Sequence, residues 1–202
     1  YEMQRSLVGS EMCIRDSQGT LCKKLYVLLE GKLRVDIIDG LGNVLINELV
    51  HPYWKKSWSE AARVNGITPD RVANAPYPHE LIPKVKGIFA AADLLVAYNN
   101  QFDLNFLEEW GIQAIGKKQF DVMLAFAREY GEWNDFFCDY KWQKLGTAAA
   151  YYGYHFRAHD SLEDVRATLY IFDQMQHSNK RELFEDYFWE DSEDEFDEEE
   201  EW

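Results

Sequence analysis

Two aspartates lie where amphipathic helices should carry apolar side chains. The segment Phe102–Trp110 predicts a helix, and at about 100° per residue Asp103 falls in the middle of its apolar face. A longer helix is expected from Ser161 to about His177, and Asp164 falls inside its apolar arc. An ionised acid on an apolar face is costly unless a charge or hydrogen-bond donor pairs with it. Each aspartate therefore needs a cation, a metal ion or a capping role.

Capping is the alternative to chemistry for both acids. Asn100 with Asp103, and Ser161 with Asp164, have the spacing of an N-cap residue and the third helical position. An acid in the first turn also gains from the helix dipole. For either aspartate alone, capping and function are equally good explanations. Two such acids with His159 between them in the sequence favour function.

The residue types restrict which metal such a site would take. The cysteines Cys13, Cys22 and Cys138 are odd in number and lack the spacing of zinc ligands. Carboxylate oxygens suit Mg²⁺ or Mn²⁺, which keep open positions for water and phosphate. Two such ions can clamp the attacking and leaving oxygens of a phosphodiester. The pair therefore suits a hard divalent cation, and phosphodiester chemistry is one use of such a site.

A histidine lies close enough in sequence to serve the same site. His159 precedes Asp164 by five residues, in the loop that should enter the long helix. Its ordinary pKa of about 6.5 suits removing a proton from water. A lone loop histidine is more often a surface residue beside a helix cap. The remaining histidines lack this setting and are expected to be structural: His51, His79, His155 and His177.

The elements around these residues alternate between strands and helices. Two β-rich runs, 33–38 and 44–50, flank DGLGN and predict a hairpin. A short apolar run, 94–98, predicts a further strand. Such alternation argues for α/β or α+β layers. Further helices are expected near 59–65, 81–92, 120–131 and 144–152.

Charge is concentrated in one part of the chain. The net charge is −15, but 13 of the 36 acids lie between Glu182 and Trp202, which leaves residues 1–181 at −2. A nearly neutral body argues against a broad footprint for duplex DNA but allows a cleft for one strand end. The tail favours solvation, with docking to a basic partner such as a polymerase as the alternative, hinted by Phe188, Trp189, Phe196 and Trp202. No apolar run reaches membrane-spanning length, and we expect a cytoplasmic protein without membrane contact.

The motifs resemble those of the DnaQ-like 3'–5' exonucleases of the DEDDh group. AYNNQFDLNFL resembles the second motif and HDSLEDVRATL the third, which implies Asp103 and Asp164 as metal ligands and His159 as general base. VNGITPDRVANAP resembles a segment beside the terminal nucleotide, with Asn65 in place of the usual histidine. The resemblance implies two Mg²⁺ or Mn²⁺ ions. It also implies substrate contacts by Asn99, Gly66, Ile67 and Thr68.

The first motif of that family, Asp-x-Glu, is missing. No such pair stands upstream of Leu33, where Glu11 and Glu30 are isolated acids, and residues 1–17 resemble a translated adapter sequence. We therefore expect a suspect or disordered leader over 1–32, an exonuclease domain over 33–180 and a disordered acidic tail over 185–202. The resemblance implies an RNase H-like α/β fold, a mixed five-stranded sheet with helices on both faces, here with a damaged first strand.

Two functions follow from these observations. The first is a 3'–5' exonuclease acting on single-stranded 3' ends, DNA favoured, in proofreading, repair or RNA trimming. The second is a catalytically inactive nucleic-acid-binding or polymerase-associated module, which the missing Asp-x-Glu supports.

Overall fold

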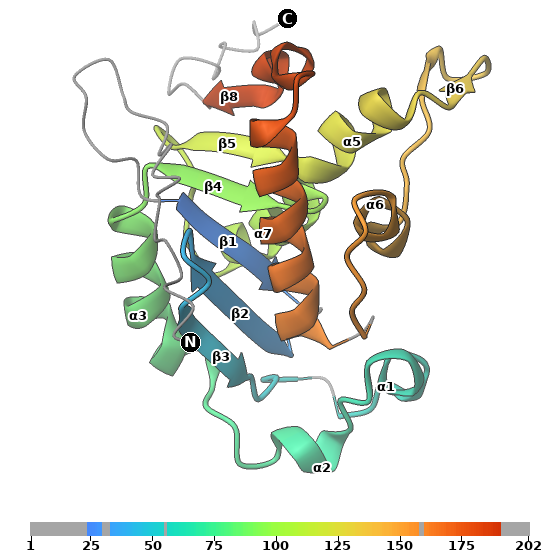
Figure 1. The fold of residues 1–202 in the computed structure, drawn as a ribbon. Helices are drawn as coiled ribbons and strands as arrows, with labels where there is room; N and C mark the ends of the chain where they lie inside the picture. Colours follow the sequence, from blue (N-terminus) through green and yellow to red (C-terminus); the bar gives the residue numbers. More distant parts are fainter. Residues whose placement is uncertain (1–23, 30–32, 55, 158–159, 191–202) are drawn as a thin grey trace, which may run out of the picture.

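A six-stranded mixed sheet forms the centre of the molecule in the computed structural model, which describes residues 24–29, 33–54, 56–157 and 160–190 (Figure 1). The strand order is β3-β2-β1-β4-β5-β8. Strands β1, β4 and β5 run parallel, whereas β2, β3 and β8 pair antiparallel with their neighbours. The strands are β1 (Lys24–Leu29), β2 (Arg34–Asp39), β3 (Val44–Leu49), β4 (Leu94–Ala97), β5 (Lys118–Asp121) and β8 (Phe188–Glu190).

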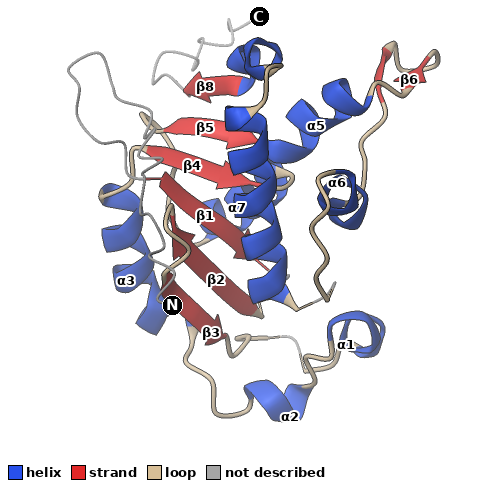
Figure 2. Ribbon diagram, in the orientation of Figure 1, coloured by secondary structure: helices blue, strands red, loops and turns tan. Residues whose placement is uncertain are grey.

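Helices cover both faces of this sheet, and α7 crosses one face along most of its width (Figure 2). A small separate hairpin, β6 (Trp133–Asn134) with β7 (Asp139–Tyr140), projects away from the sheet (Figure 1). The helices are α1 (Ser59–Asn65), α2 (Pro69–Val72), α3 (Pro78–Ala90), α4 (Asn100–Glu109), α5 (Val122–Tyr130), α6 (Leu145–Tyr151), α7 (Ser161–His177) and the 3-10 helix η1 (Arg181–Tyr187).

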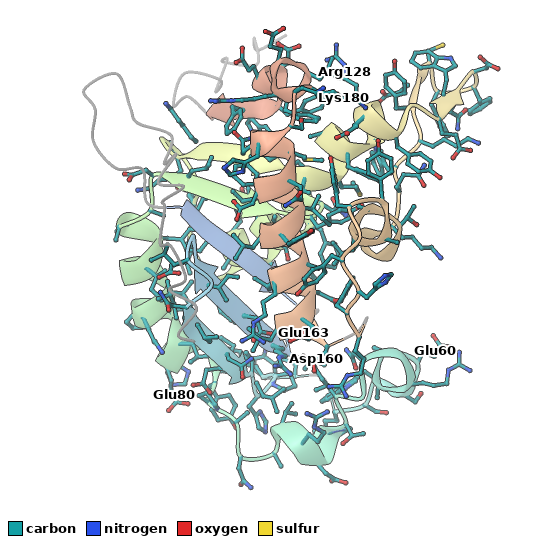
Figure 3. All side chains as sticks on the ribbon, in the orientation of Figure 1. Glu60, Glu80, Arg128, Asp160, Glu163 and Lys180 are labelled. Atoms are coloured by element: carbon teal, nitrogen blue, oxygen red, sulfur yellow. The ribbon has the colours of Figure 1, made fainter. Side chains whose placement is uncertain are left out.

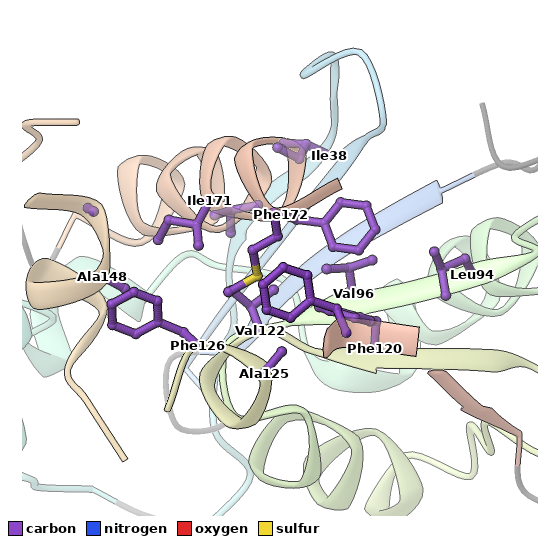
Figure 4. Close-up of a cluster of buried hydrophobic side chains, with 14 residues drawn as sticks. Ile38, Leu94, Val96, Phe120, Val122, Ala125, Phe126, Ala148, Ile171 and Phe172 are labelled. Carbon is purple, nitrogen blue, oxygen red and sulfur yellow. The ribbon is translucent and has the colours of Figure 1, made fainter. Parts of the chain in front are cut away.

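Two apolar cores explain why the central strands are buried on both sides. In β4 the side chain of Leu95 joins the core with α3 and α4. Leu94 and Val96 join the core with α5, α6 and α7, which Figure 4 shows. Successive side chains of a strand point to opposite faces, so a strand covered on both faces is apolar throughout. This accounts for the uninterrupted run that predicted a strand at 94–98.

The expected hairpin is confirmed as β2 and β3. Its turn is stabilised by Asp39, whose carboxylate accepts hydrogen bonds from the backbone N–H groups of Leu41 and Asn43, both at 2.9 Å. Gly42 has a φ of +83°, which a residue with a side chain rarely adopts. The expected short helix and the long helix are confirmed as α1 and α7.

The sheet has six strands, so the expectation of five was wrong. The sixth strand, β8, comes from the segment assigned to a disordered tail beginning at residue 185. Phe188 packs with ring centroids 4.6 Å from Phe120 and 6.4 Å from Phe172, so it belongs to the core and is not free for docking. Residues 191–202, which include Phe196 and Trp202, lie outside the described residues.

The first strand is also present. β1 lies in the middle of the sheet, between β2 and β4, although its residues fall in the stretch 1–32 that was expected to be a leader. Its sequence, KLYVLL, carries no acid. Residues 1–23 and 30–32, Glu11 and Glu30 among them, lie outside the described residues. No helix in the described part of the chain is long and apolar enough to cross a membrane.

Candidate active site

The helices that carry the two candidate aspartates begin at the same end of the sheet, near the carboxyl ends of the parallel strands. β1 and β4 are parallel, with Tyr26 beside Val96, so their carboxyl ends point the same way. Helix α4 begins at Asn100, directly after β4. Helix α7 begins at Ser161, whose hydroxyl donates to Asp36, and Asp36 lies opposite Leu28 near the end of β1. Asp103 and Asp164 are each the fourth residue of a helix that starts at this end of the sheet.

Asp103 is buried, as the helical pattern predicted. Its residue exposure is 1%, and Leu107, one turn further along, is fully buried in the core under α4. Phe102 was expected on the same apolar face, but 49% of it is exposed. Its ring instead packs edge-on against Phe106, at a centroid distance of 4.9 Å. The buried face of α4 is therefore shifted away from Phe102, and Asp103 lies within it beside Asn100 and Leu107.

Asp164 is half-buried in the first turn of α7. Its backbone N–H donates to the carbonyl of Asp160 at 2.9 Å, and its carbonyl accepts from the hydroxyl of Thr168 at 3.0 Å. Val165 and Thr168 beside it are buried. The main chain of Asp164 is therefore held firmly, while its side chain keeps partial access to solvent.

A second buried carboxylate, Asp121, supports the start of α4. It accepts backbone N–H groups of Asn100 at 2.7 Å and Asn99 at 3.3 Å, and caps α5 by accepting those of Met123 at 2.8 Å and Leu124 at 3.1 Å. Burial raises the pKa of Asp121, and the four N–H groups oppose that rise. One carboxylate thus fixes the entry of the helix that carries Asp103. The sequence offered a signal for the α5 cap only, an acid directly before a helix.

The two asparagines before Asp103 differ from the expected capping arrangement. Asn100 was expected to cap α4, but it is the first helical residue, and its side-chain amide donates to Gln119 at 2.9 Å. Asn99 takes the cap position in a left-handed conformation, with φ of 70° and ψ of 65°. Short polar residues tolerate that conformation better than most. Whether Asn99 contacts substrate remains a prediction.

A third carboxylate, Asp36 in β2, ties the start of α7 to the sheet. Asp36 is fully buried and accepts side-chain hydrogen bonds from Arg34 at 2.7 Å, from Asn47 of β3 and from Ser161. A buried carboxylate with donors from three elements is well satisfied. Ser161 therefore binds the sheet and does not cap its own helix. The sequence analysis missed Asp36, although an acid inside an apolar strand, RVDIID, was a signal that could have found it.

Charged residues also gather at the N-terminal end of α7, where the chain enters the helix. The guanidinium of Arg157, 2.8 Å from Asp160, holds the pKa of that carboxyl below its usual range, and the charge of Arg34 adds to the effect. Figure 3 shows Asp160 and Glu163 close together at this end of the helix. His159, the expected general base, lies outside the described residues, so its role stays a prediction.

The expected nucleotide-binding segment is mostly engaged within the protein. Ile67 is buried with Trp58 and Val72, and its carbonyl accepts from the Trp58 indole. The Gly66 carbonyl accepts from Arg71 at 2.9 Å. Thr68 is exposed. Its hydroxyl is the group of this segment that is best placed to meet a ligand, and substrate contacts by the segment remain a prediction.

Asn65, where the resembling family has histidine, has a structural role in this chain. Its side-chain oxygen accepts the N–H of Ile67 at 3.0 Å and closes a turn at the end of α1.

The donor chemistry of the described site suits a hard cation. Asp103 and Asp164 offer carboxylate oxygens, which Mg²⁺ and Mn²⁺ prefer. Among the described residues, no three or more His, Cys, Asp or Glu side chains group as metal ligands. Two carboxylates with water and phosphate suffice for a single Mg²⁺, which normally keeps several waters. They are too few for two ions.

The fold is of the α/β class, and sequence comparison identifies the family of the chain. The exonuclease family profile matches residues 37–172. The chain belongs to this exonuclease family. An uncharacterized exonuclease, CP81, of Escherichia phage 186 is 30% identical over 155 residues, which cover 71% of this chain and 78% of CP81. A PolC-type DNA polymerase III of Thermotoga petrophila is 28% identical over 115 residues, which span 55% of this chain and only 8% of the polymerase.

Solved structures share the fold at low sequence identity. Exonuclease X, solved with 5' overhanging duplex DNA, matches with a TM-score of 0.54 and 17% identity, over 82% of this chain and 98% of that chain. The nuclease domain of 3'hExo, a DEDDh family member bound to rAMP, matches with a TM-score of 0.55 and 16% identity, over 76% of this chain and 90% of that domain. These matches confirm the expected α/β class and the RNase H-like fold.

Proposed function

We propose that this chain hydrolyses phosphodiester bonds at the 3' end of single-stranded nucleic acid, with DNA favoured. The observation that carries the proposal is the position of Asp103 and Asp164: each lies near the start of a helix, and both helices begin at the same end of the sheet. The membership of the exonuclease family and the nucleic acids named with its structural neighbours, a DNA duplex with an overhang and a histone mRNA stem-loop, support it.

In this proposal the two aspartates hold a divalent cation, Mg²⁺ or Mn²⁺. Such an ion, when bound, polarises the phosphate and activates water. Asp103, buried near the start of α4, and Asp164, half-buried in the first turn of α7, would supply the carboxylate ligands of this ion. His159 accepts the proton of the attacking water, because its ordinary pKa lies near neutral pH. Asp121 and Asp36 hold the two helices in position.

The test uses oligonucleotides labelled at the 5' end, so that shortening from the 3' end gives a ladder. We expect Mg²⁺-dependent shortening by the wild type and a loss of at least about 100-fold in Asp164→Asn, because even indirect supports of a metal site cost about 10- to 100-fold. Glu163→Gln is the matched control. Glu163 neighbours Asp164 but pairs with Arg166 at 2.8 Å on the polar side of α7, so its rate should stay within about 2-fold. Undiminished turnover in Asp164→Asn would refute the assignment.

A catalytically inactive binding module is the second candidate. The observation in its favour is that the sequence of the central strand β1, KLYVLL, contains no Asp or Glu. This function predicts binding of single-stranded DNA with no ladder in either Mg²⁺ or Mn²⁺. Turnover that disappears in Asp164→Asn excludes it.

A further inference from the structure

A stack of aromatic rings lies on the surface where the chain leaves β3 and enters α3. Tyr53 stacks on Tyr77 at a centroid distance of 5.4 Å and on His79 at 6.0 Å, with interplanar angles of 12° in both pairs. His51 adds a tilted contact to Tyr77 at 4.5 Å, and Trp54 adds one to Tyr53 at 6.5 Å. We call these five residues the aromatic platform. None of them belongs to the site described above.

Hydrogen bonds hold the platform in shape. The Tyr53 hydroxyl lies 2.6 Å from Nδ1 of His79 and accepts the backbone N–H of the same residue at 3.2 Å. The backbone N–H of His51 donates to the carbonyl of Pro76 at 2.8 Å. The rings of Tyr53 and His79 are fixed in this way and give the platform a rigid base, which loses little further freedom when a ligand binds.

The platform nevertheless presents its rings to solvent. Trp54 is 91% exposed, Tyr53 50% and Tyr77 38%. An exposed aromatic ring is suited to stack on a flat ligand, and every nucleobase has such a face; Trp54 is tilted by 47° from Tyr53 and is the most exposed of the rings.

The surrounding charge is the opposite of that of the whole chain. Residues 51–84, which include the whole platform, contain five basic residues (Lys55, Lys56, Arg63, Arg71 and Lys84) and three acids (Glu60, Asp70 and Glu80), a net charge of +2 in a chain of −15. The platform segment itself, residues 51–58, has two lysines and no acid. A phosphate backbone is attracted to a local surplus of this sign even when the rest of the protein is negative.

The platform lies at the end of the molecule where α7 begins. Leu49, the last residue of β3, pairs with Arg34, and Arg34 binds the same Asp36 that holds Ser161. Four residues carry the chain from Leu49 to Tyr53, at most about 14 Å. Helices α1 and α2 lie at this end as well (Figure 1). The platform therefore lies within a distance from the start of α7 that a few nucleotides can span.

We propose that the aromatic platform binds bases of single-stranded nucleic acid a few nucleotides upstream of the 3' end, with Trp54 as its main stacking surface. This inference rests on the proposed function for the identity of the ligand. It adds a second binding region, which reads no sequence, because stacking tolerates every base. Long strands should therefore bind more tightly than strands too short to span both regions.

The experiment measures binding of fluorescein-labelled dT3 and dT12 by anisotropy in EDTA, where turnover cannot interfere. Trp54→Ala should weaken dT12 binding by about 5-fold or more, the factor that the loss of one stacked base corresponds to, and should leave dT3 binding unchanged. Trp142→Ala is the matched control. Trp142 is also an exposed tryptophan, at 63%, but lies beyond the separate hairpin, and its removal should change neither affinity.

Equal dT12 affinity of the wild type and Trp54→Ala overturns the platform. So does an equal loss in Trp142→Ala, since it would mean that any exposed tryptophan contributes. A chain that shows the Trp54 effect but never shortens a strand in Mg²⁺ or Mn²⁺ supports the platform and overturns the proposed hydrolysis.

Discussion

Asp121→Ala should lower the free energy of unfolding more than the loss of any exposed carboxylate. The carboxylate of Asp121 is 2% exposed as a residue and accepts four backbone N–H groups, two at the start of α4 and two at the start of α5. Loss of the α5 cap costs about 0.5–2 kcal/mol. Loss of the acceptor for the buried N–H of Asn100 adds about 1–3 kcal/mol. The free energy of unfolding should therefore fall by about 2–5 kcal/mol, and Tm by about 4–20 °C.

Urea denaturation followed by circular dichroism measures this change directly. Asp39→Ala is the matched control, because Asp39 also accepts two backbone N–H groups at 2.9 Å but does so in the exposed hairpin turn. Water can replace Asp39 there, so its loss should cost less than about 1 kcal/mol. If Asp121→Ala lost no more stability than Asp39→Ala, the view that Asp121 supports both helices would be wrong.

Three further predictions concern the same network and the site. Asp36→Asn should lower the turnover number about 10- to 100-fold with little change in KM, because the substitution loosens the start of α7 without removing a substrate contact. Steady-state kinetics of this variant and of the control Asp39→Asn would show whether only the buried acid matters. His159→Ala should lower the rate by about 100-fold or more yet leave Mn²⁺ affinity, measured by calorimetry, unchanged; a fall in affinity would make His159 a ligand. Because burial raises the pKa of Asp121, the pH-dependent part of its contribution to stability is present below the unfolded pKa of about 3.9 and is lost as pH rises through the folded pKa, whereas its hydrogen bonds to the four N–H groups remain. Denaturation curves should therefore show the stability advantage of the wild type over Asp121→Asn shrinking from pH 3.5 to pH 7, and a constant gap would contradict the shift.

The elements that the sequence predicted best are those with long periodic patterns. Helix α7 was expected from Ser161 to about His177 and has those bounds, because its apolar period repeats over several turns. Strand β5, Lys118–Asp121, was missed, since four residues with a single large apolar side chain give no period. Strand β8 was missed because an acidic composition concealed Phe188, which the core of β5 and α7 holds in place.

The candidate site also has one part that the sequence predicts and one part that it does not. The burial of Asp103 could be predicted, because a helical pattern is local. The supporting acids could not, since Asp36 and Ser161 are 125 residues apart, and Asp121 is 21 residues from Asn100. Such pairings depend on strand order, which no local pattern contains.

The position of β8 has a consequence for the order in which the protein can fold during synthesis. β8 forms one edge of the sheet by pairing with β5, yet residues 122–187 are translated between them. Until β8 leaves the ribosome, the nascent chain exposes the unpaired backbone of β5 and the side of Phe120 that Phe188 covers. A translation pause within that interval would prolong this state, and the exposed strand edge could then pair with neighbouring nascent chains on the same messenger RNA.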